Sequence, residues 1–393
     1  MPTTRGWTAI GVAAALLMLW SAFGERELMT TALFLASAVA LGVLFVRMTT
    51  PSVDIDRRLY PPAVYAGDTV TVEVHVASRR RLRNVEVEDM VHGLGVARFA
   101  ASRAAPSDPL IARYEVACRE RGAYAVGPTS VAVSDPFALA EHRTSAGVVD
   151  RLVVYPRIEK LHGFPSVRGN DPAIQATRPT FAPNGGDDFF TLREYQTGDD
   201  LRKVHWPSSA KRDDLVIKQL EVPWQSRALV LLDSRSDRYL TDEAFEHAVR
   251  GAASAVTHLH QGGFSPELWT SQRAPGTRSG NRHQQAMDVL ATVQPVPHLD
   301  LRSTVARMRR QGVGGGALVL VTGPPDESTL AAYRMLSRDF GRTIVMAVTN
   351  TVDASLGSLE RSAAITVIAA TGVPWGPPWR TAMERSWSTA SAG

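Results

Sequence analysis

The architecture of this chain is set by GWTAIGVAAALLMLWSAFG at residues 6–24 and LMTTALFLASAVALGVLFV at residues 28–46. Neither stretch contains a charged residue. Each has about 19 residues, roughly 28 Å as a helix, which matches the hydrocarbon thickness of a bilayer. A helix is the structure that satisfies its own backbone groups in lipid. Because only Glu25, Arg26 and Glu27 separate the stretches, the sequence predicts a transmembrane hairpin.

Positive charges around the spans predict their orientation. Arg5 precedes the first span, and Arg47, Arg57 and Arg58 follow the second. Flanking Lys and Arg favour the cytoplasmic side. We therefore expect a cell-membrane protein with two spans and both termini in the cytoplasm. The alternative is a cleaved signal peptide, with Arg5 as its basic start, followed by one span.

The composition of the chain excludes several classes of protein. Its 393 residues allow two or three domains, and its 44% apolar and 21% charged residues are typical of globular proteins. One cysteine, Cys118, excludes an intramolecular disulfide scaffold and a cysteine-rich zinc site. The net charge of +4 is small for this length and does not call for nucleic acid as a partner.

Residues 51–150 predict a β-sandwich. Apolar and polar residues alternate over 69–76 and 84–88, and further strand patterns cover 111–117, 124–126 and 129–133. Short strands separated by Gly and Pro turns are typical of a sandwich. The basic stretch Arg79–Arg83 is either a solvated hairpin loop or a contact to anionic lipid headgroups.

Residues 151–225 predict a connector followed by a dense polar segment. This segment interleaves opposite charges with aromatic and aliphatic residues, which predicts partly buried ion pairs and a structural or docking role. Ligand binding remains open. Acid–base catalysis by Asp199, Asp200, Arg202 or His205 is a further alternative, although no nucleophile or metal spacing accompanies them.

Residues 226–393 predict an α/β domain with a doubly wound parallel sheet. Strand patterns at 227–233, 266–270, 316–322 and 342–349 alternate with helix patterns at 242–261, 282–293, 303–310 and 327–338. Thr241 is expected to cap the helix over 242–261. Gly312–Ala317 matches a dinucleotide-binding spacing but precedes a strand, which is the wrong context. No motif for catalysis is present, so we expect a protein that is not an enzyme.

The segment GDDFFTLREYQTGDDLRKVHWPSSAKRDDLVIKQLE resembles the signature of a bacterial family named domain of unknown function 58. The preceding Asp135-Pro136-Phe137 and Tyr155-Pro156-Arg157 fit the same family. The signature residues of the resemblance are Phe190, Leu192, Arg193, Glu194, Tyr195, Gly198, Asp199, Asp200, Arg202, His205, Trp206, Ser209, Ala210 and Lys211.

This resemblance implies an architecture and partners. Members of the family carry an N-terminal membrane hairpin, and the domain after the signature is similar to von Willebrand factor A domains. They are typically encoded beside MoxR-type AAA ATPases and transglutaminase-like membrane proteins. The resemblance therefore implies an adaptor that contacts both proteins and the lipid bilayer.

A von Willebrand A-like domain raises the question of a metal ion. Its metal site uses the pattern D-x-S-x-S, whose oxygens suit Mg²⁺. Here Asp233-Ser234-Arg235-Ser236-Asp237 places Arg and Asp where the serines should be. The weak metal candidates are Asp233, Ser234 and Ser236, and the alternative is that Asp233 caps the loop that follows. No other cofactor is expected.

The sequence as a whole favours a membrane-anchored interaction protein. It would work with a MoxR-type ATPase in complex or envelope assembly. One alternative is a metal- or ligand-binding receptor that uses the strand ends of the α/β domain. A hydrolase built on Asp199, Asp200 and His205 is the third hypothesis.

Overall fold

The computed structural model divides the chain into two compact units, Met1–Arg157 and Ile158–Gly393. It describes residues 1–49, 53–79, 82–106, 109–164, 190–194, 209, 216–220, 227–271, 281–297, 300–311, 313–314, 316–350, 354–361 and 365–391.

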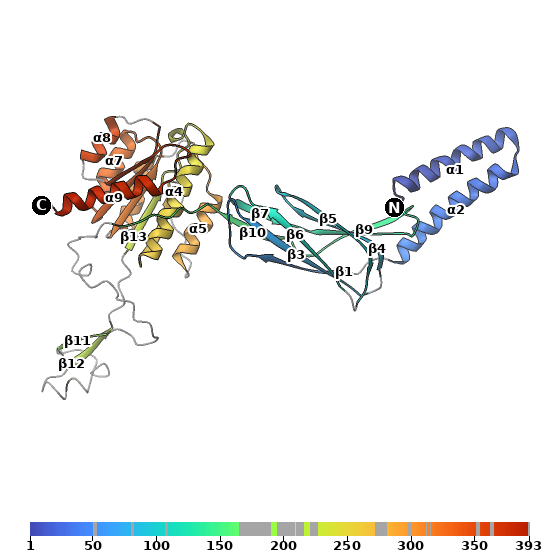
Figure 1. Cartoon of the computed structure of the whole chain (residues 1–393), viewed down its shortest axis with the longest axis horizontal. Helices are drawn as coiled ribbons and strands as arrows, with labels where there is room; N and C mark the ends of the chain where they lie inside the picture. The colour runs from blue at the N-terminus through green and yellow to red at the C-terminus, as the bar shows by residue number, and fades with distance from the viewer. Residues whose placement is uncertain are drawn as a thin grey trace. The chain divides into compact units, whose positions relative to one another are not determined.

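The first unit begins with two antiparallel helices, α1 (Thr4–Phe23) and α2 (Arg26–Met48) (Figure 1). Gly24 ends α1 with a φ of 73°, a conformation that glycine adopts without strain. Both helices are long and apolar enough to cross a membrane. Large apolar side chains such as Phe34 and Leu41 are exposed on them. The predicted pair of apolar helices is therefore present as two candidate spans.

One loop of the sandwich contacts both helices of the first unit. Thr3 donates its backbone N–H to Leu139 O (2.9 Å) and its hydroxyl to Ala138 O (2.6 Å). A Cβ at Gly6 would lie 2.0 Å from the Leu139 oxygen, so only glycine allows this approach. On α2, a Cβ at Gly42 would lie 3.3 Å from the Asp135 carboxylate. The start of α1 and the later half of α2 thus contact the same loop.

Two sheets of this unit form a β-sandwich around an aliphatic core. One has the order β1-β3-β6 and the other β2-β10-β7-β4-β8-β9, with β5 paired to β4. The strands are β1 (Val53–Tyr60), β2 (Val64–Tyr65), β3 (Thr69–Ser78), β4 (Leu82–Val91), β5 (Gly95–Ala104), β6 (Leu110–Ala117), β7 (Gly122–Val126), β8 (Thr129–Ser134), β9 (Glu141–Ala146) and β10 (Asp150–Tyr155). Residues 151–155, expected in the connector, form β10 because Leu152 and Val154 point into the core.

An arginine lies among the inward-facing residues of β1. Arg57 is in phase with Val53, Ile55 and Leu59, and its side chain is 2% exposed. Its Nη2 contacts Asp89 Oδ1 at 2.7 Å, and its Nε contacts the second oxygen of the same carboxylate at 3.1 Å. Such a buried pair leaves a costly uncompensated charge when one partner is removed.

The second unit contains a parallel sheet with the order β14-β13-β15-β16-β17. Its strands are β13 (Arg227–Leu232), β14 (Ser265–Thr270), β15 (Ala317–Thr322), β16 (Arg342–Val348) and β17 (Ile365–Ala369). In chain order this is 2-1-3-4-5, one of the two common doubly wound orders. The predicted parallel sheet is therefore present.

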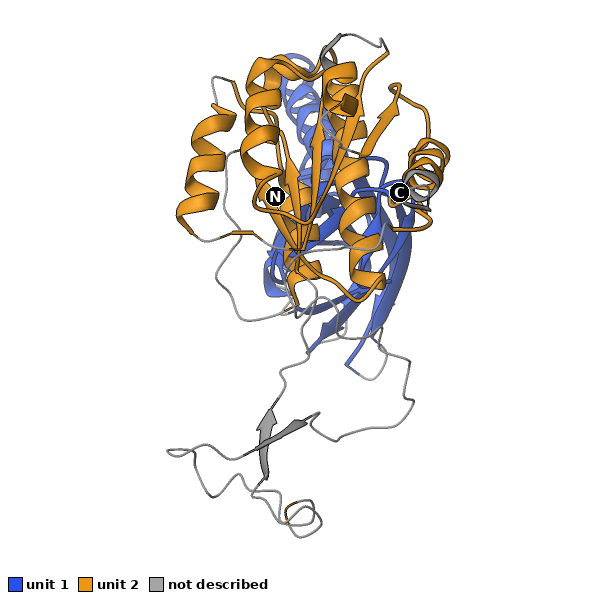
Figure 2. Ribbon diagram, turned by 90° about the vertical axis from the view of Figure 1, so that its left-hand side faces the viewer, with its two compact units in different colours: residues 1–157 blue, residues 158–393 orange. Residues whose placement is uncertain are grey.

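Helices cover both faces of this sheet (Figure 2). They are α4 (Asp242–Gln261), α5 (Arg282–Thr292), α6 (Leu301–Arg310), α7 (Glu327–Leu336), α8 (Ala354–Arg361) and α9 (Gly376–Ser391). Leu229 and Leu231 pack against α6, α7 and α8. On α4, Thr241 accepts a hydrogen bond from Ala244 N, which confirms the predicted cap.

A histidine and a tryptophan join α4 to the segment before α9. The His247 ring stacks on Trp375 with centroids 4.9 Å apart, and Trp375 Nε1 donates to the His247 carbonyl. His247 is 1% exposed, and its ring nitrogens have no hydrogen-bond partner among the described residues. Burial lowers the pKa of His247 to about 4. The neutral ring is therefore the form that fits this packing.

Replacing Arg57 by alanine should open the sandwich. Asp89 would lose its partner at a cost of about 3–5 kcal/mol. The readout is the rate at which a thiol reagent labels Cys118, a free cysteine that is fully buried in the sandwich. We expect this rate to rise by roughly two to three orders of magnitude. Arg58→Ala, at an exposed neighbour, should leave the rate unchanged. Equal rates for both variants would contradict the assigned role of Arg57.

The second unit should lose stability in acid because of His247. A folded-state pKa near 4, against about 6.5 in the unfolded chain, means that protonation favours unfolding. The unfolding free energy, followed by tryptophan fluorescence, should therefore fall between pH 7.5 and pH 5. His247→Phe, which keeps the stacking, should reduce that fall by about 1–2 kcal/mol. An unchanged pH dependence in this variant would refute the assignment.

Candidate functional site

The candidate site lies where the order of the parallel sheet reverses. β13 has β14 on one side and β15 on the other, and the chain passes from β13 to each of them in turn. Open α/β sheets bind ligands at the carboxyl ends of their strands beside such a switch point. Asp233 follows β13 and Thr322 ends β15, so both lie at this edge, as the sequence position of Asp233 predicts.

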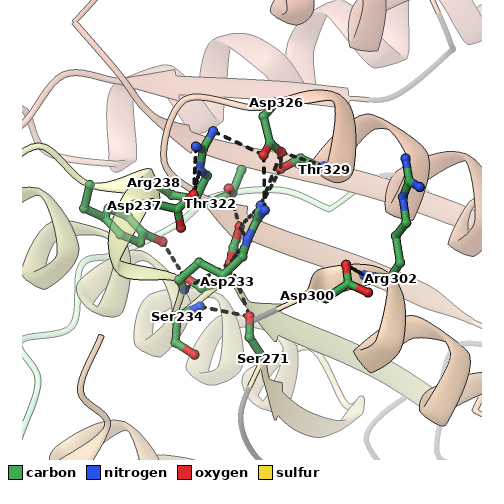
Figure 3. A network of polar contacts seen from close by, with 12 residues as sticks. Asp233, Ser234, Asp237, Arg238, Ser271, Asp300, Arg302, Thr322, Asp326 and Thr329 are labelled. Carbon is green, nitrogen blue, oxygen red and sulfur yellow. Dashed lines mark hydrogen bonds and ion pairs between the residues drawn. The ribbon is translucent and has the colours of Figure 1, made fainter. Parts of the chain in front are cut away.

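The carboxylate of Asp233 is fully buried and surrounded by donors of the protein itself (Figure 3). Its Oδ1 accepts from Arg235 Nε (2.9 Å) and from Ser271 Oγ (3.2 Å). Its Oδ2 accepts from Arg235 Nη2 (2.7 Å) and from Thr322 Oγ1 (3.0 Å). Both oxygens are therefore already satisfied by neighbouring side chains.

Arg235 binds two carboxylates at once. Besides Asp233, its Nη1 contacts Asp326 Oδ2 at 3.2 Å, and its Nη2 donates to Thr329 Oγ1 at 2.9 Å. The guanidinium is only 4% exposed. The planar fork of arginine suits such bidentate contacts, whereas a lysine offers one point charge. Arg235 thus links the loop after β13 to the start of α7.

Asp326 is placed by its role as the N-terminal cap of α7. Its carboxylate accepts from Thr329 N and Thr329 Oγ1, both at 2.7 Å. Burial alone would raise its pKa, but the hydrogen bonds from Thr329 and the pairing with Arg235 lower the pKa of Asp326 to about 2. Asp326 is therefore ionised at neutral pH and is not a proton donor there.

The exposed rim of this edge is charged and carries one prominent apolar residue. Arg238 contacts Asp326 at 3.3 Å and Asp237 at 2.9 Å. Leu240, two residues further, is 93% exposed. The side chain before it, Tyr239, donates its hydroxyl to the Asp233 carbonyl, and burial raises its pKa. The hydrogen bond from Tyr239 thus fixes the rim to the buried loop at Asp233, and Leu240 is exposed on the rim.

The donor set at this edge does not suit the metal ion considered from the sequence. Asp233 accepts the Arg235 backbone N–H (3.2 Å), as in the loop-capping alternative. Ser234 Oγ is buried without a hydrogen-bond partner among the described residues, and Ser236 begins a short helical turn. The Arg235 guanidinium occupies the position beside Asp233 where a cation would bind. In the described ranges no cluster of three His, Cys, Asp or Glu residues is present.

Much of the signature segment lies outside the described residues. Phe190, Leu192, Arg193 and Glu194 belong to β11 (Phe190–Glu194), which pairs antiparallel with β12 (Val216–Leu220). Ser209 is buried. The residues outside the described ranges are Tyr195, Gly198, Asp199, Asp200, Arg202, His205, Trp206, Ala210 and Lys211. The docking and catalytic hypotheses for them stay predictions.

The partners of Asp233 were not identified from the sequence. Arg235 counted there only as a departure from a metal-binding pattern, and Thr322 only as the end of a predicted strand. One signal was available. Asp326 and Thr329 have the spacing of a helix cap just before the helix predicted from Glu327. Together with Arg235, two residues after Asp233, a capping aspartate at position 326 is compatible with an internal ion pair.

The fold and this edge define a doubly wound α/β domain. At the edge where open α/β sheets bind ligands, Arg235 pairs with the buried Asp233. Residues 191–363 match the family described as "Protein of unknown function DUF58". The matched range includes β13 to β16 and the residues of the edge.

Two further similarities were found. The chain is 26% identical over 259 residues to "Uncharacterized protein YeaD" from Bacillus subtilis, covering 63% of this chain and 61% of that relative. The chain thus spans less than two thirds of that relative's length. The CARDB domain of the PF1109 protein from Pyrococcus furiosus is similar over 26% of this chain and 88% of its own, with 14% identity and a TM-score of 0.21.

Replacing Arg235 should destabilise the α/β domain. Arg235→Ala leaves the buried charge of Asp233 without its partner, and we expect a loss of about 3–5 kcal/mol in unfolding free energy. Arg235→Lys should recover less than half of this, because lysine cannot bind both carboxylates. Denaturant unfolding, followed through the buried Trp269, Trp375 and Trp379, measures the change.

Arg302→Ala provides the matched control for this edge. Arg302 is exposed in the first turn of α6, near Asp300 (Figure 3). A positive side chain at a helix N-terminus adds no stability, so its removal should be neutral. Wild-type stability of Arg235→Ala would contradict the role assigned to the ion pair.

Proposed function

We propose that this chain is a membrane-anchored, non-enzymatic interaction protein. The observation that carries the proposal is the closed edge of the α/β domain. At the position where such domains take up ligands, Asp233 and Arg235 satisfy each other and Asp326 is held ionised. A carboxylate in this state is neither a free metal ligand nor an acid at neutral pH. What the edge presents to solvent is a rigid rim suited to a protein partner.

The rim has features of a protein-binding surface. An exposed apolar residue with charged neighbours has the arrangement of an apolar contact within a polar rim. Leu240 would supply the anchor, while Asp237 and Arg238 would give electrostatic selectivity. Because Tyr239 is fixed to Asp233 from below, Leu240 is held in place before a partner binds. Such preorganisation lowers the entropic cost of association.

The partner that we propose is a MoxR-type AAA ATPase. This choice rests on the resemblance of the signature segment, which also implies a transglutaminase-like membrane protein as a neighbour. The two candidate spans would tether the chain, and with it the α/β domain, to the bilayer. In this arrangement the chain would position the ATPase at the cytoplasmic face of the membrane during complex or envelope assembly.

Co-purification tests this proposal. The tagged full chain, solubilised in mild detergent, should enrich a MoxR-type ATPase of the same organism over a tag-only control. Leu240→Asp should reduce this enrichment about tenfold, because a charge replaces the apolar anchor. Val148→Asp is the matched control, since Val148 is also a highly exposed aliphatic residue but lies in the sandwich.

Three outcomes are decisive. Enrichment lost only with Leu240→Asp supports the rim as the docking surface. Enrichment that survives Leu240→Asp would place the contact elsewhere on the chain and contradict the rim. If the wild-type chain does not enrich the ATPase, the adaptor function itself is wrong.

A further inference from the structure

Three connections of the sandwich lie at the same end as the helices. β1 begins at Val53, shortly after α2 ends at Met48. The register pairs Val53 with Ser78, which brings the β3–β4 turn to this end. It also pairs Leu82 with Ala104 and Ser134 with Glu141. The β5–β6 connection and the β8–β9 loop therefore share this end, as the first unit in Figure 1 shows.

This end carries a group of arginines, which we call the membrane-side arginines: Arg47, Arg79, Arg83 and Arg103. All four are exposed. Arg47 lies in the last turn of α2, and Arg83 and Arg103 are direct partners across β4 and β5. The carboxylates of Asp54 and Glu141 lie at this end too, whereas Asp135 is buried.

An aromatic side chain lies on the β8–β9 loop, at the same end of the sandwich. Phe137 is 74% exposed. Its backbone N–H donates to Asp135 Oδ1 (2.8 Å), which fixes the loop from within. Thr3 fixes the same loop to the start of α1 through Ala138 O and Leu139 O. The residues that follow Phe137 are therefore tied to the residue that caps α1.

We propose that this end of the sandwich is a lipid-facing surface. Its arginines would bind the phosphates of anionic headgroups, and Phe137 would enter the interfacial region of the bilayer. Guanidinium groups bind phosphate oxygens in a forked geometry, and aromatic rings concentrate at membrane interfaces. This proposal rests on the membrane anchoring in the proposed function, because the two candidate spans set the depth of the surface.

The surface would have a mechanical consequence. α1 and α2 meet the sandwich at Gly6 and Gly42, two glycines whose contacts leave no space for a side chain or nearly none. If lipid headgroups bind the arginines as well, the sandwich is held against the bilayer at several points. The sandwich would then stand in a defined orientation on the membrane instead of swinging from it.

Site-directed fluorescence on the full chain tests this surface. Phe137→Cys in a Cys118→Ala background carries an environment-sensitive NBD label in vesicles. The vesicles contain phosphatidylcholine alone or with about one third phosphatidylglycerol. We expect a blue-shifted NBD emission that shifts further with phosphatidylglycerol and recedes at high salt, since salt screens exposed charges. Val148→Cys, labelled in the same way, should show a water-like emission in both.

The arginines are tested in the same labelled chain. Arg47→Gln, Arg79→Gln, Arg83→Gln and Arg103→Gln together should abolish the difference between the two lipid compositions. These positions are exposed, so the far-UV spectrum of the variant should match that of the wild type. Resistance to carbonate extraction shows whether the chain is still inserted in the membrane.

The outcomes separate this inference from the proposed function. A water-like emission at position 137 in a carbonate-resistant chain overturns the lipid-facing surface and leaves the anchoring intact. A lipid-composition effect that survives the replacement of all four arginines overturns their role. A chain that carbonate extracts overturns both the anchoring and the surface.

Discussion

The buried pair of Asp233 and Arg235 is the interaction on which the α/β domain depends. Without Arg235, Asp233 would be a buried charge with no opposite charge beside it, which is costly in free energy. Arg235 compensates that charge and also binds Asp326, so the loop after β13 is fixed to the start of α7. The same contacts close the edge where other domains of this architecture bind ligands. Stability and function are therefore linked at this point.

The sandwich also contains a buried arginine that pairs with two carboxylates. Arg57 lies in the core between Asp89 and Asp150 and also donates to Thr129 Oγ1. Buried pairs of this kind contribute to a unique arrangement more than to net stability. In both units a guanidinium fork thus fixes elements that are distant in sequence.

Local patterns predicted much of the fold, and long-range contacts account for what was missed. The helix capped by Thr241 and the strand after residue 226 have strong periodicity, so both were predicted. The packing of Trp375 was not predicted, because it depends on contacts with His247 and Gly251, which are far away in the chain. For the edge, the position of Asp233 was predictable. Its pairing with Arg235 was not, because the residues were compared only with a metal-binding pattern.

The central claim is that Arg235 occupies the cation position at the edge of the α/β domain. A crystal structure of the protein grown with Mn²⁺, measured with anomalous scattering, tests it most directly. Our account predicts the Arg235 guanidinium within hydrogen-bonding distance of both Asp233 and Asp326, and no anomalous peak beside Asp233. A Mn²⁺ ion bound to Asp233, with Arg235 displaced toward solvent, would contradict it.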